Sequence, residues 1–262
     1  MNLIDLQIKK IKRNKQLGLM VHAVVGYPTQ EKSEMLIRSL INRKVDFLEL
    51  QIPFSDPIAD GPTIVRASEK ALKRGTNTDS VLELIGKLRG DIHIPVIIMA
   101  YYNSILSYGL VKFCRKAKKL NISGLIVPDM PPEEEDRERF IQTSFEYGLY
   151  PIRVVSPSSS KKRLEINTRY AKGFIYSVSH FGVTGSGVKI GNDLVGYINE
   201  VKKTVRLPIA VGFGIEKKEQ VEKLNDIADI AVVGSAIIRN YEKGGLNRLK
   251  LFIKELKEGT IY

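Results

Sequence analysis

The chain of 262 residues contains no tryptophan and only one cysteine, Cys114. A single cysteine excludes an intrachain disulfide and any metal cluster built from several cysteines, and it fits a reducing compartment. The longest apolar runs, such as Ile94 to Tyr102, fall far short of the roughly 20 residues that span a bilayer. The basic residues Lys9–Arg13 follow a short mixed segment, whereas in a signal peptide they would precede an apolar one. We therefore expect a soluble cytoplasmic protein with no membrane partner.

Glycine and proline, with 21 and 11 residues, are too sparse for a collagen-like or low-complexity chain. Lys and Arg total 41 against 29 Asp and Glu, which gives a net charge of +12. The basic residues are spread along the chain and alternate with Glu, a pattern typical of a solvated surface. Only Lys9–Lys15 is a concentrated basic run, and no aromatic RNA-binding motif or zinc finger accompanies it. We expect no nucleic-acid partner. A basic RNA-binding barrel is the alternative, and it would lose RNA as salt rises.

The three histidines, His22, His93 and His180, have no carboxylate or second histidine at metal-ligand spacing. We therefore predict no metal site. Cys114 lies in a segment with helical apolar spacing, where a lone cysteine packs as a small apolar side chain.

Eight short apolar runs alternate with longer amphipathic segments. The runs are Leu19–Val25, Phe47–Ile52, Ile94–Tyr101, Leu125–Val127, Leu149–Val155, Phe174–Val178, Ile209–Phe213 and Ile230–Val233. Strands that alternate with helices predict a mostly parallel sheet, and eight such units in about 250 residues predict a (β/α)8 barrel. A doubly wound open sheet is the alternative, but Gly212-Phe213-Gly214 lacks the third glycine of its usual cofactor motif. We expect a single α/β domain over residues 1–262, a TIM barrel with an extra N-terminal helix over residues 3–13.

The segments between the runs have apolar residues at helical spacing, as in residues 33–43, 64–74 and 133–147. The last of these predicts one continuous helix. Asp129 is placed to cap it, Pro131 and Pro132 fit its first turn, and Gly148 is placed to end it.

The second run predicts an acidic group inside the barrel. Side chains alternate along a strand, so Glu49 shares a face with Phe47 and Gln51, while the opposite face is wholly apolar and suits packing against helices. A carboxyl group in the barrel mouth suits general acid–base catalysis. The alternative is a surface or ion-paired Glu49. Asp56 and Asp60 follow in a loop rich in Pro and Gly, where each taken singly suits a turn or a helix cap, and Asp60 is placed to cap a helix that begins near Pro62.

Glycine-rich turns follow three of the later runs. Gly212-Phe213-Gly214 and Gly234-Ser235 come after the seventh and eighth runs, where barrels of this kind commonly bind phosphate. Glycine lets the backbone approach an anion closely, and free amides at a helix start bind it. The alternative is plain turn glycines. The segment 179–187 after the sixth run is also rich in glycine, and it suits a ligand-covering loop or an ordinary mobile one.

The block Leu48–Ile64 closely resembles the signature of the tryptophan synthase alpha subunit family. The resemblance extends in order along nearly the whole chain, through Tyr27-Pro28, Tyr101-Tyr102-Asn103, Val127–Pro131, Gly182–Gly185, Val211–Ile215 and Gly234–Ala236. It implies a lyase that cleaves indole-3-glycerol phosphate to indole and glyceraldehyde 3-phosphate in tryptophan biosynthesis. It also implies a beta subunit that takes the indole and holds pyridoxal phosphate, in an alpha-beta-beta-alpha complex, while this chain needs no cofactor.

The resemblance also implies site roles, residue by residue. Glu49 is the acid–base residue, Asp60 accepts a hydrogen bond from the indole N–H, and Tyr176 lines the site near Glu49. The implied substrate-binding residues are Tyr102, Thr184, Gly185, Phe213, Gly214, Gly234 and Ser235. Asp56 and Pro57 match the loop that touches the beta subunit.

The sequence departs from the family at two positions. Gln51 stands where the family usually has glycine, so it is expected to narrow the site, bond to Glu49 or alter the rim that faces the partner. His180 stands where the family usually has arginine, which puts the usual contacts of that loop in doubt. A stand-alone lyase that releases free indole, and an inactive subunit that only activates a beta partner, are the alternatives.

Overall fold

The computed structural model of the protein describes residues 1–178, 192–212 and 214–261. Its strands are β1 (Gly18–Val24), β2 (Phe47–Gln51), β3 (Val96–Met99), β4 (Gly124–Ile126), β5 (Tyr150–Val155), β6 (Ile175–Val178), β7 (Ile209–Gly212) and β8 (Ile230–Val233). Its α-helices are α1 (Leu3–Arg13), α2 (Gln30–Ile41), α3 (Pro62–Lys73), α4 (Thr78–Leu88), α5 (Tyr102–Tyr108), α6 (Leu110–Lys119), α7 (Glu135–Glu138), α8 (Phe140–Glu146), α9 (Lys161–Tyr170), α10 (Asn192–Thr204), α11 (Lys218–Glu222) and α12 (Ser235–Glu258), with short 3-10 turns η1 (Arg89–Asp91) and η2 (Pro132–Glu134).

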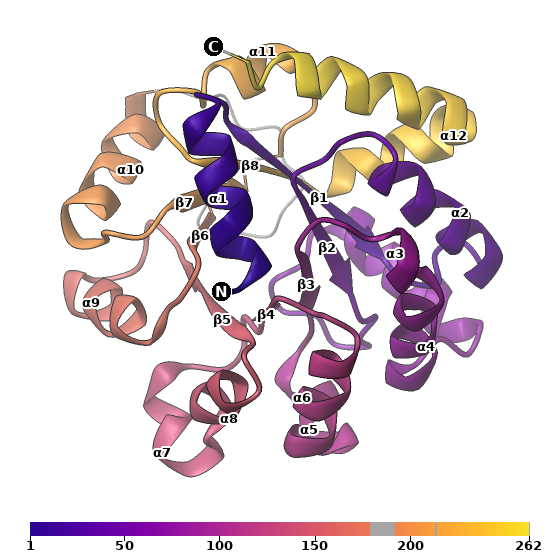
Figure 1. Ribbon diagram of the computed structural model, residues 1–262, viewed down its shortest axis with the longest axis horizontal. Helices are drawn as coiled ribbons and strands as arrows, with labels where there is room; N and C mark the ends of the chain where they lie inside the picture. The colour runs from indigo at the N-terminus through magenta and orange to yellow at the C-terminus, as the bar shows by residue number, and fades with distance from the viewer. Residues whose placement is uncertain (179–191, 213, 262) are drawn as a thin grey trace.

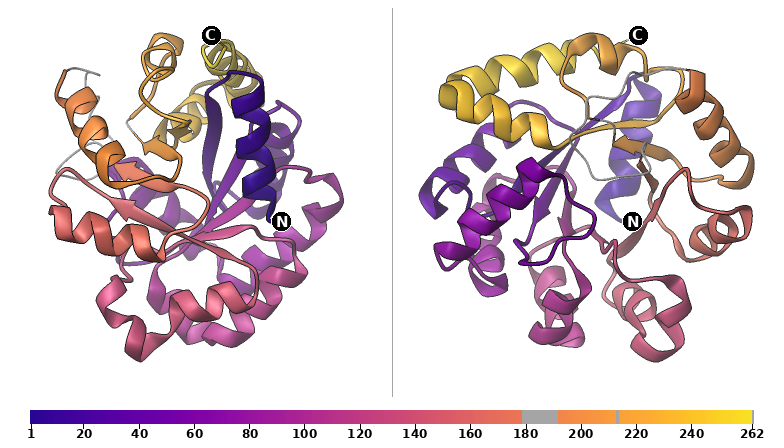
Figure 2. Two further views of the ribbon diagram at one scale, coloured as in Figure 1. Left: turned by 60° about the vertical axis from the view of Figure 1, so that its left-hand side comes forward. Right: turned by 180° about the vertical axis from the view of Figure 1, so that it is seen from behind.

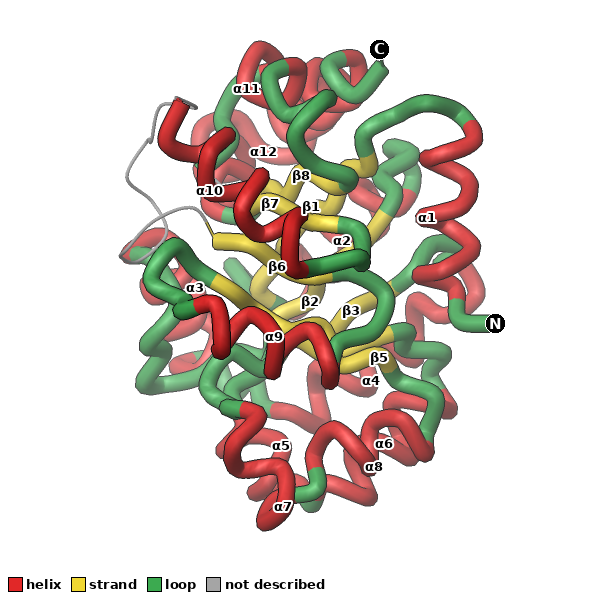
Figure 3. The backbone as a smooth tube through the Cα atoms, turned by 90° about the vertical axis from the view of Figure 1, so that its left-hand side faces the viewer, coloured by secondary structure: helices red, strands yellow, loops and turns green. Residues whose placement is uncertain are grey.

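The eight strands form a closed parallel barrel. Each strand pairs with its neighbours in the sequence, and β8 closes the barrel by pairing with β1. The helices surround the strands as an outer ring (Figure 1), which Figure 3 shows as a red layer around the yellow barrel. This topology confirms the expected TIM barrel and excludes the open sheet. Of the described helices, none has the length and apolar character to cross a membrane.

Alternate residues of the strands build two separate cores. Leu48 and Leu50 point outward into the large apolar layer between barrel and helices. Phe47 points into the barrel, where its ring meets Phe174 edge to face at 5.9 Å between centroids. The predicted alternation of β2 is therefore confirmed, because the pleat of a strand sends successive side chains to opposite faces.

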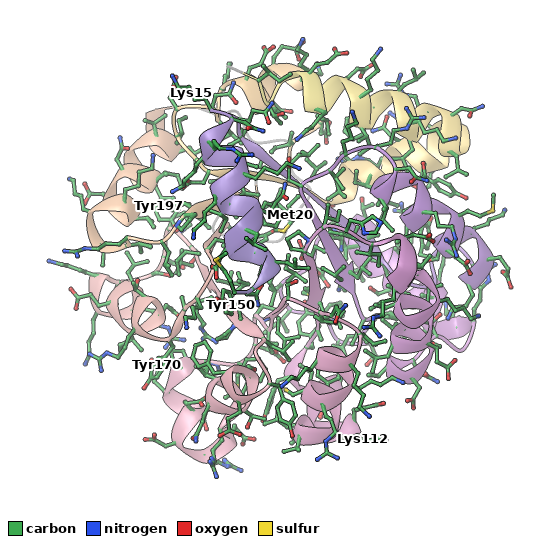
Figure 4. All side chains as sticks on the ribbon, in the orientation of Figure 1. Lys15, Met20, Lys112, Tyr150, Tyr170 and Tyr197 are labelled. Atoms are coloured by element: carbon green, nitrogen blue, oxygen red, sulfur yellow. The ribbon has the colours of Figure 1, made fainter. Side chains whose placement is uncertain are left out.

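Helix α1 closes the end of the barrel at which the strands begin. Ile4, Ile8 and Ile11 pack into the interior core with side chains such as Met20, and in Figure 1 α1 lies across the near end of the strands. Met20 and Tyr150 are labelled beside this helix in Figure 4, and the Tyr150 hydroxyl donates to Asp5 at 2.6 Å. The side chains of α1 thus fill the end of the barrel at which the strands begin. The opposite end, where the strands finish, remains for a ligand.

The helix predicted over residues 133–147 is wrong as a single element. The chain forms η2 and α7, takes a left-handed conformation at Arg139 (φ 52°, ψ 27°), and then forms α8. The break is stabilised by the Glu135 carboxylate, which accepts hydrogen bonds from the backbone N–H groups of Ile141 and Gln142, both at 2.7 Å. These are two of the free donors that the break creates at the start of α8. Gly148 (φ +74°) follows α8 as predicted.

Asp129 was expected to cap that same segment, and it caps another helix. Its carboxylate accepts from the backbone N–H of Tyr102, with distances of 2.9 and 3.0 Å to its two oxygens. Tyr102 begins α5, so the cap is supplied from a different loop of the barrel rim.

Candidate active site

A cavity opens at the carboxyl ends of the strands, opposite α1. The right-hand view of Figure 2 looks at the side of the molecule opposite α1. The cavity encloses about 760 Å³ of space between atoms, part of it open to solvent. Its apolar wall includes Ile64, Met99, Ile126, Val154, Val178, Ile215 and Val232, and its polar and glycine positions are His22, Glu49, Asp60, Tyr176, Gly212, Gly214, Gly234 and Ser235.

Glu49 projects from the inner face of β2 into this cavity and is only 3% exposed. The neighbouring strand β1 places His22 directly opposite it in the parallel register. His22 Nδ1 lies 3.1 Å from Glu49 Oε1. Burial alone would lower the pKa of His22, but the charge of the Glu49 carboxylate and its hydrogen bond outweigh burial and raise that pKa above its ordinary 6.5. The carboxylate thus favours the charged form of the imidazole beside it.

Asp60 lies at the end of the loop after β2 and is held by Gln51. Gln51 Nε2 donates to Asp60 Oδ2 at 2.6 Å, and the two side chains are 0% and 8% exposed. Of the roles that we considered for Gln51, the structure therefore shows a bond to Asp60, not to Glu49. Asp60 does not cap α3, since the N-cap residue of that helix is Gly61. Burial raises the pKa of Asp60, although the hydrogen bond from Gln51 and the nearby His22 oppose the rise.

Tyr101, the N-cap residue of α5 just after β3, supports the same loop. Its ring stacks on Phe54 at 5.0 Å between centroids, and its hydroxyl accepts from the backbone N–H of Ala59 at 3.0 Å. The phenol also acts on Asp60, and burial together with that carboxylate raises the pKa of Tyr101. The neutral phenol thus fixes the position of the loop residue that precedes Asp60.

Three buried polar atoms in this region have no hydrogen-bond partner among the described residues. They are His22 Nε2, Glu49 Oε2 and Gln51 Oε1. Buried polar atoms without partners are uncommon in proteins, and at a cavity they mark groups that a ligand can satisfy. The three atoms, two of them on cavity-lining side chains, indicate a binding site for a polar ligand.

Tyr176 reaches across from β6. Burial, followed by the charges of Glu49 and Asp60, raises the pKa of Tyr176 well above its ordinary value. The phenol is therefore a neutral donor next to two carboxyl groups. Gly212 on β7 leaves room for the ring, because a Cβ at that position would lie 2.7 Å from the Tyr176 hydroxyl oxygen.

The turns after β7 and β8 form the rim of the cavity. Gly214 has φ +63°, a left-handed conformation that favours glycine. Gly234 is the N-cap of α12, with no side-chain cap on the helix, and Ser235 is the first residue of that helix, which is kinked at Gly244 and Gly245. The free N–H groups at such a helix start attract an anion. The two turns that the sequence suggested for phosphate thus meet at one cavity.

The remaining sequence-predicted residues lie elsewhere or outside the described part of the chain. Tyr102, expected beside the substrate, is not in the cavity wall: its ring packs against Phe140 outside the barrel, and its hydroxyl donates to Glu138 at 2.8 Å. Asp56 is exposed and Pro57 half-buried on the rim loop. Thr184, Gly185, Phe213 and the divergent His180 are outside the described residues.

Sequence reasoning missed His22 and Tyr101 as site residues. His22 was considered only as a metal ligand, and its partner Glu49 lies on another strand. The usable signal was the inward face of β1, because His22 falls in alternation with Met20, which is inside the barrel. Tyr101 was passed over in favour of its neighbour Tyr102, but Tyr101 packs into the interior core of the barrel whereas Tyr102 begins α5.

No cluster of three or more His, Cys, Asp or Glu side chains suited to a metal ion occurs in the described part of the chain. Cys114 is a buried free thiol in the outer core, and burial raises its pKa to about 12. Such a thiol is protonated and unreactive at neutral pH, so it acts as an apolar side chain, as expected.

Comparison with known proteins identifies the family. A sequence model described as the tryptophan synthase alpha chain matches residues 8–260. The alpha chain of Desulforapulum autotrophicum is 37% identical over 254 residues, which are 97% of this chain and 100% of that protein. The alpha chain of Dehalococcoides mccartyi is 40% identical over 245 residues, or 93% and 95% of the two chains.

Solved structures give the same result. A chain of Mycobacterium tuberculosis tryptophan synthase superposes with a TM-score of 0.91 at 31% identity, covering 99% of this chain and 98% of that one. The alpha chain of Legionella pneumophila superposes with a TM-score of 0.90 at 31% identity, covering 99% and 97%. Because the family model matches nearly the whole of this chain, from residue 8 to residue 260, the chain belongs to the tryptophan synthase alpha chain family.

Proposed function

We propose that the chain cleaves indole-3-glycerol phosphate into indole and glyceraldehyde 3-phosphate, a retro-aldol reaction. The observation that supports this most strongly is the presence of two buried carboxyl groups, Glu49 and Asp60, in one cavity with the uncapped start of α12. Groups for proton transfer and a site for an anion thus lie within reach of one phosphate ester. Membership of the family supports the same reaction.

The reaction breaks the bond between C3 of the indole ring and the first carbon of the glycerol phosphate side chain. A proton added to C3 places positive charge on the indole nitrogen, and the electron pair of the breaking bond then neutralises that charge. The hydroxyl on the departing carbon loses its proton and becomes the aldehyde carbonyl. We assign the proton exchange to Glu49 and the hydrogen bond from the indole N–H to Asp60, whose negative charge stabilises the charged ring. The phenol of Tyr176 bounds the space beside Glu49.

We assign the phosphate of the substrate to the turns after β7 and β8. Gly214 and Gly234 let the backbone come close to an anion, and the hydroxyl of Ser235 adds a donor at the start of α12. From the family resemblance, Gly185 and Phe213 contribute to the same phosphate site, and Thr184 helps to close the loop over it.

We further propose that the chain works in the cytoplasm in an alpha-beta-beta-alpha complex with a beta subunit. The beta subunit receives the indole and holds pyridoxal phosphate, whereas the alpha reaction proceeds by proton transfer and needs no cofactor in this chain. The exposed Asp56, the half-buried Pro57 and the apolar Ile58, which is 73% exposed, leave the rim loop available to such a partner.

The test is indole release from indole-3-glycerol phosphate by the purified chain, with and without a beta subunit. We expect weak release by the chain alone and a sharp increase with the partner. Full activity that the partner leaves unchanged would instead favour a stand-alone lyase. Absence of indole in both reactions would refute the proposed reaction and favour an inactive, activating subunit.

A further inference from the structure

His22 and Glu49 form a pair that the reaction scheme above does not use. Their Cα atoms are partners in the register of β1 and β2, and both side chains point into the barrel. The two are 6% and 3% exposed, with Nδ1 and Oε1 3.1 Å apart. On its other side, the His22 ring faces Gly234, where an added Cβ would lie 3.8 Å from His22 Cβ. The imidazole is therefore fixed between the acid–base carboxyl and the start of α12.

The pair leaves one oxygen of Glu49 without a partner. Oε1 contacts His22, whereas Oε2 has no hydrogen-bond partner among the described residues. A carboxylate that is held at one oxygen keeps a single orientation, and its second oxygen stays available to a reacting group. Histidine is suited to hold a catalytic group in this way. One ring nitrogen can bond to that group while the other stays available for a second hydrogen bond.

The two carboxyl groups around the pair both raise the pKa of His22. The groups that act on His22 are Glu49 on β2, Asp60 on the loop after β2 and the amide of Gln51, and together they overcome burial and raise the pKa of His22. Tyr176, on β6 across the barrel, faces the same two carboxyls and is neutral. The neighbouring carboxyl groups thus favour the charged form of His22 over its neutral form.

We propose that His22 is a positioning residue for Glu49: its Nδ1–H holds one carboxylate oxygen, which leaves the second oxygen to exchange protons with the substrate. This inference deepens the proposed lyase reaction and rests on it. Glu49 remains the residue that touches the substrate, and His22 acts through it.

The inference predicts how the pH dependence responds when His22 is replaced. The substitution removes a cationic group 3.1 Å from the reacting carboxyl, so the acid side of the pH profile of kcat moves toward higher pH. An opposite charge at this distance changes such a midpoint by about one pH unit or more. A residue that only fills space at this position would leave the midpoint unchanged.

Two variants separate the charge of His22 from its hydrogen bond. His22→Phe removes both, and His22→Asn removes the charge but keeps an N–H near the position of Nδ1. We expect both to move the acid midpoint upward by about one pH unit or more. On the alkaline plateau, we expect His22→Phe to lose about tenfold or more in kcat with little change in KM, and His22→Asn to recover most of the loss. His93→Gln, which changes an exposed histidine before β3, is the matched control and should leave the profile unchanged.

An unchanged acid midpoint in His22→Asn overturns the inference. If His22→Phe does not fold, His22→Asn decides the question alone. Failure of the proposed reaction is distinct, because the unsubstituted chain then forms no indole at any pH.

A second readout needs no substrate. The nitrogen resonances of the three histidine rings are followed by NMR between about pH 5 and pH 9, and the signal lost in His22→Asn identifies His22. We expect its midpoint to lie above 6.5 in the unsubstituted chain and to fall in Glu49→Gln, because removal of the carboxylate leaves burial as the larger influence. A midpoint at or below 6.5, or one that Glu49→Gln leaves in place, overturns the inference even in an active enzyme.

Discussion

The bond between Gln51 and Asp60 gives a prediction whose magnitude follows from the structure. Gln51→Met keeps the length of the side chain but removes the Nε2 donor to Asp60. A hydrogen bond to a charged group is worth about 1.5–3 kcal/mol, so its loss destabilises the folded chain at neutral pH. The same substitution removes the buried Oε1, which has no partner among the described residues and costs about 1–3 kcal/mol. The two contributions oppose each other, so the net change at neutral pH is small.

The pH dependence separates these two contributions. Gln51 Oε1 does not titrate, and His22, on which the Gln51 amide acts, has a pKa above its ordinary 6.5, so the contribution of Oε1 changes little as the pH falls below that value. The bond to Asp60 weakens when Asp60 takes up a proton, from about 1.5–3 to about 0.5–1.5 kcal/mol. The free-energy difference between the parent chain and the variant therefore changes by about 1–1.5 kcal/mol as the pH falls.

The direction of this change follows from the coupling between proton binding by Asp60 and folding. The Gln51 bond favours ionised Asp60, so the variant has the higher Asp60 pKa and the parent gains stability relative to it above that pKa. The gain is present at neutral pH and is lost as the pH falls toward the ordinary value of 3.8, because burial raises the pKa of Asp60 from that value.

The assay is urea unfolding of parent and variant at several pH values between neutral and about pH 4. Gln142→Met is the matched control, because Gln142 donates to Glu146 at 3.1 Å in an exposed pair. Its effect should stay within about 0.5 kcal/mol at every pH. A difference between parent and Gln51→Met that does not change with pH would refute the assigned role of Gln51.

Three further substitutions test the fold and the cavity. Phe47→Ala should cost about 3–5 kcal/mol of unfolding free energy in urea, because the ring fills the barrel interior against Phe174; a cost under about 1 kcal/mol would contradict this packing. Gly212→Ala places a Cβ 2.7 Å from the Tyr176 hydroxyl and should lower kcat for indole formation by roughly tenfold to a hundredfold, whereas an unchanged kcat would contradict the role of that close approach. Glu135→Ala removes the cap of α8 and should lower the unfolding free energy by about 0.5–2 kcal/mol, and no loss would argue against the cap.

Much of the barrel follows from local patterns. The eight apolar runs correspond to the eight strands, and the alternation of Phe47, Glu49 and Gln51 predicted the inner face of β2. These features depend on the period of two along a strand, which a sequence displays directly. The helix ahead of β1 was likewise visible from its spacing.

The breaks and caps were not predictable in the same way. The left-handed Arg139 divides the segment that was expected to be one helix, and no glycine or proline marks the position. Its stabilisation comes from Glu135, a residue that is common within helices. The cap supplied by Asp129 serves α5, which precedes it by more than 20 residues, so local sequence could not assign it.

The contacts within the site depend on how strands pair. Glu49 was predicted from strand alternation and the role of Asp60 from the family resemblance, whereas His22 meets Glu49 only through the register of β1 with β2. A shift of one residue in that register would send one of the two side chains to the other face. Gln51 was expected to alter the site, but its choice of Asp60 over Glu49 depends on the path of the loop after β2.

The central claim is that Glu49 exchanges the protons of a carbon–carbon cleavage in this cavity. The most direct test compares Glu49→Gln with the parent chain, with a beta subunit present, in two assays: indole formation and binding of glycerol phosphate. We predict that turnover falls by about a hundredfold or more while binding is retained, because the substitution removes the proton-exchanging group and leaves the turns after β7 and β8 intact. A loss of turnover under about tenfold, with binding unchanged, would contradict the role of Glu49.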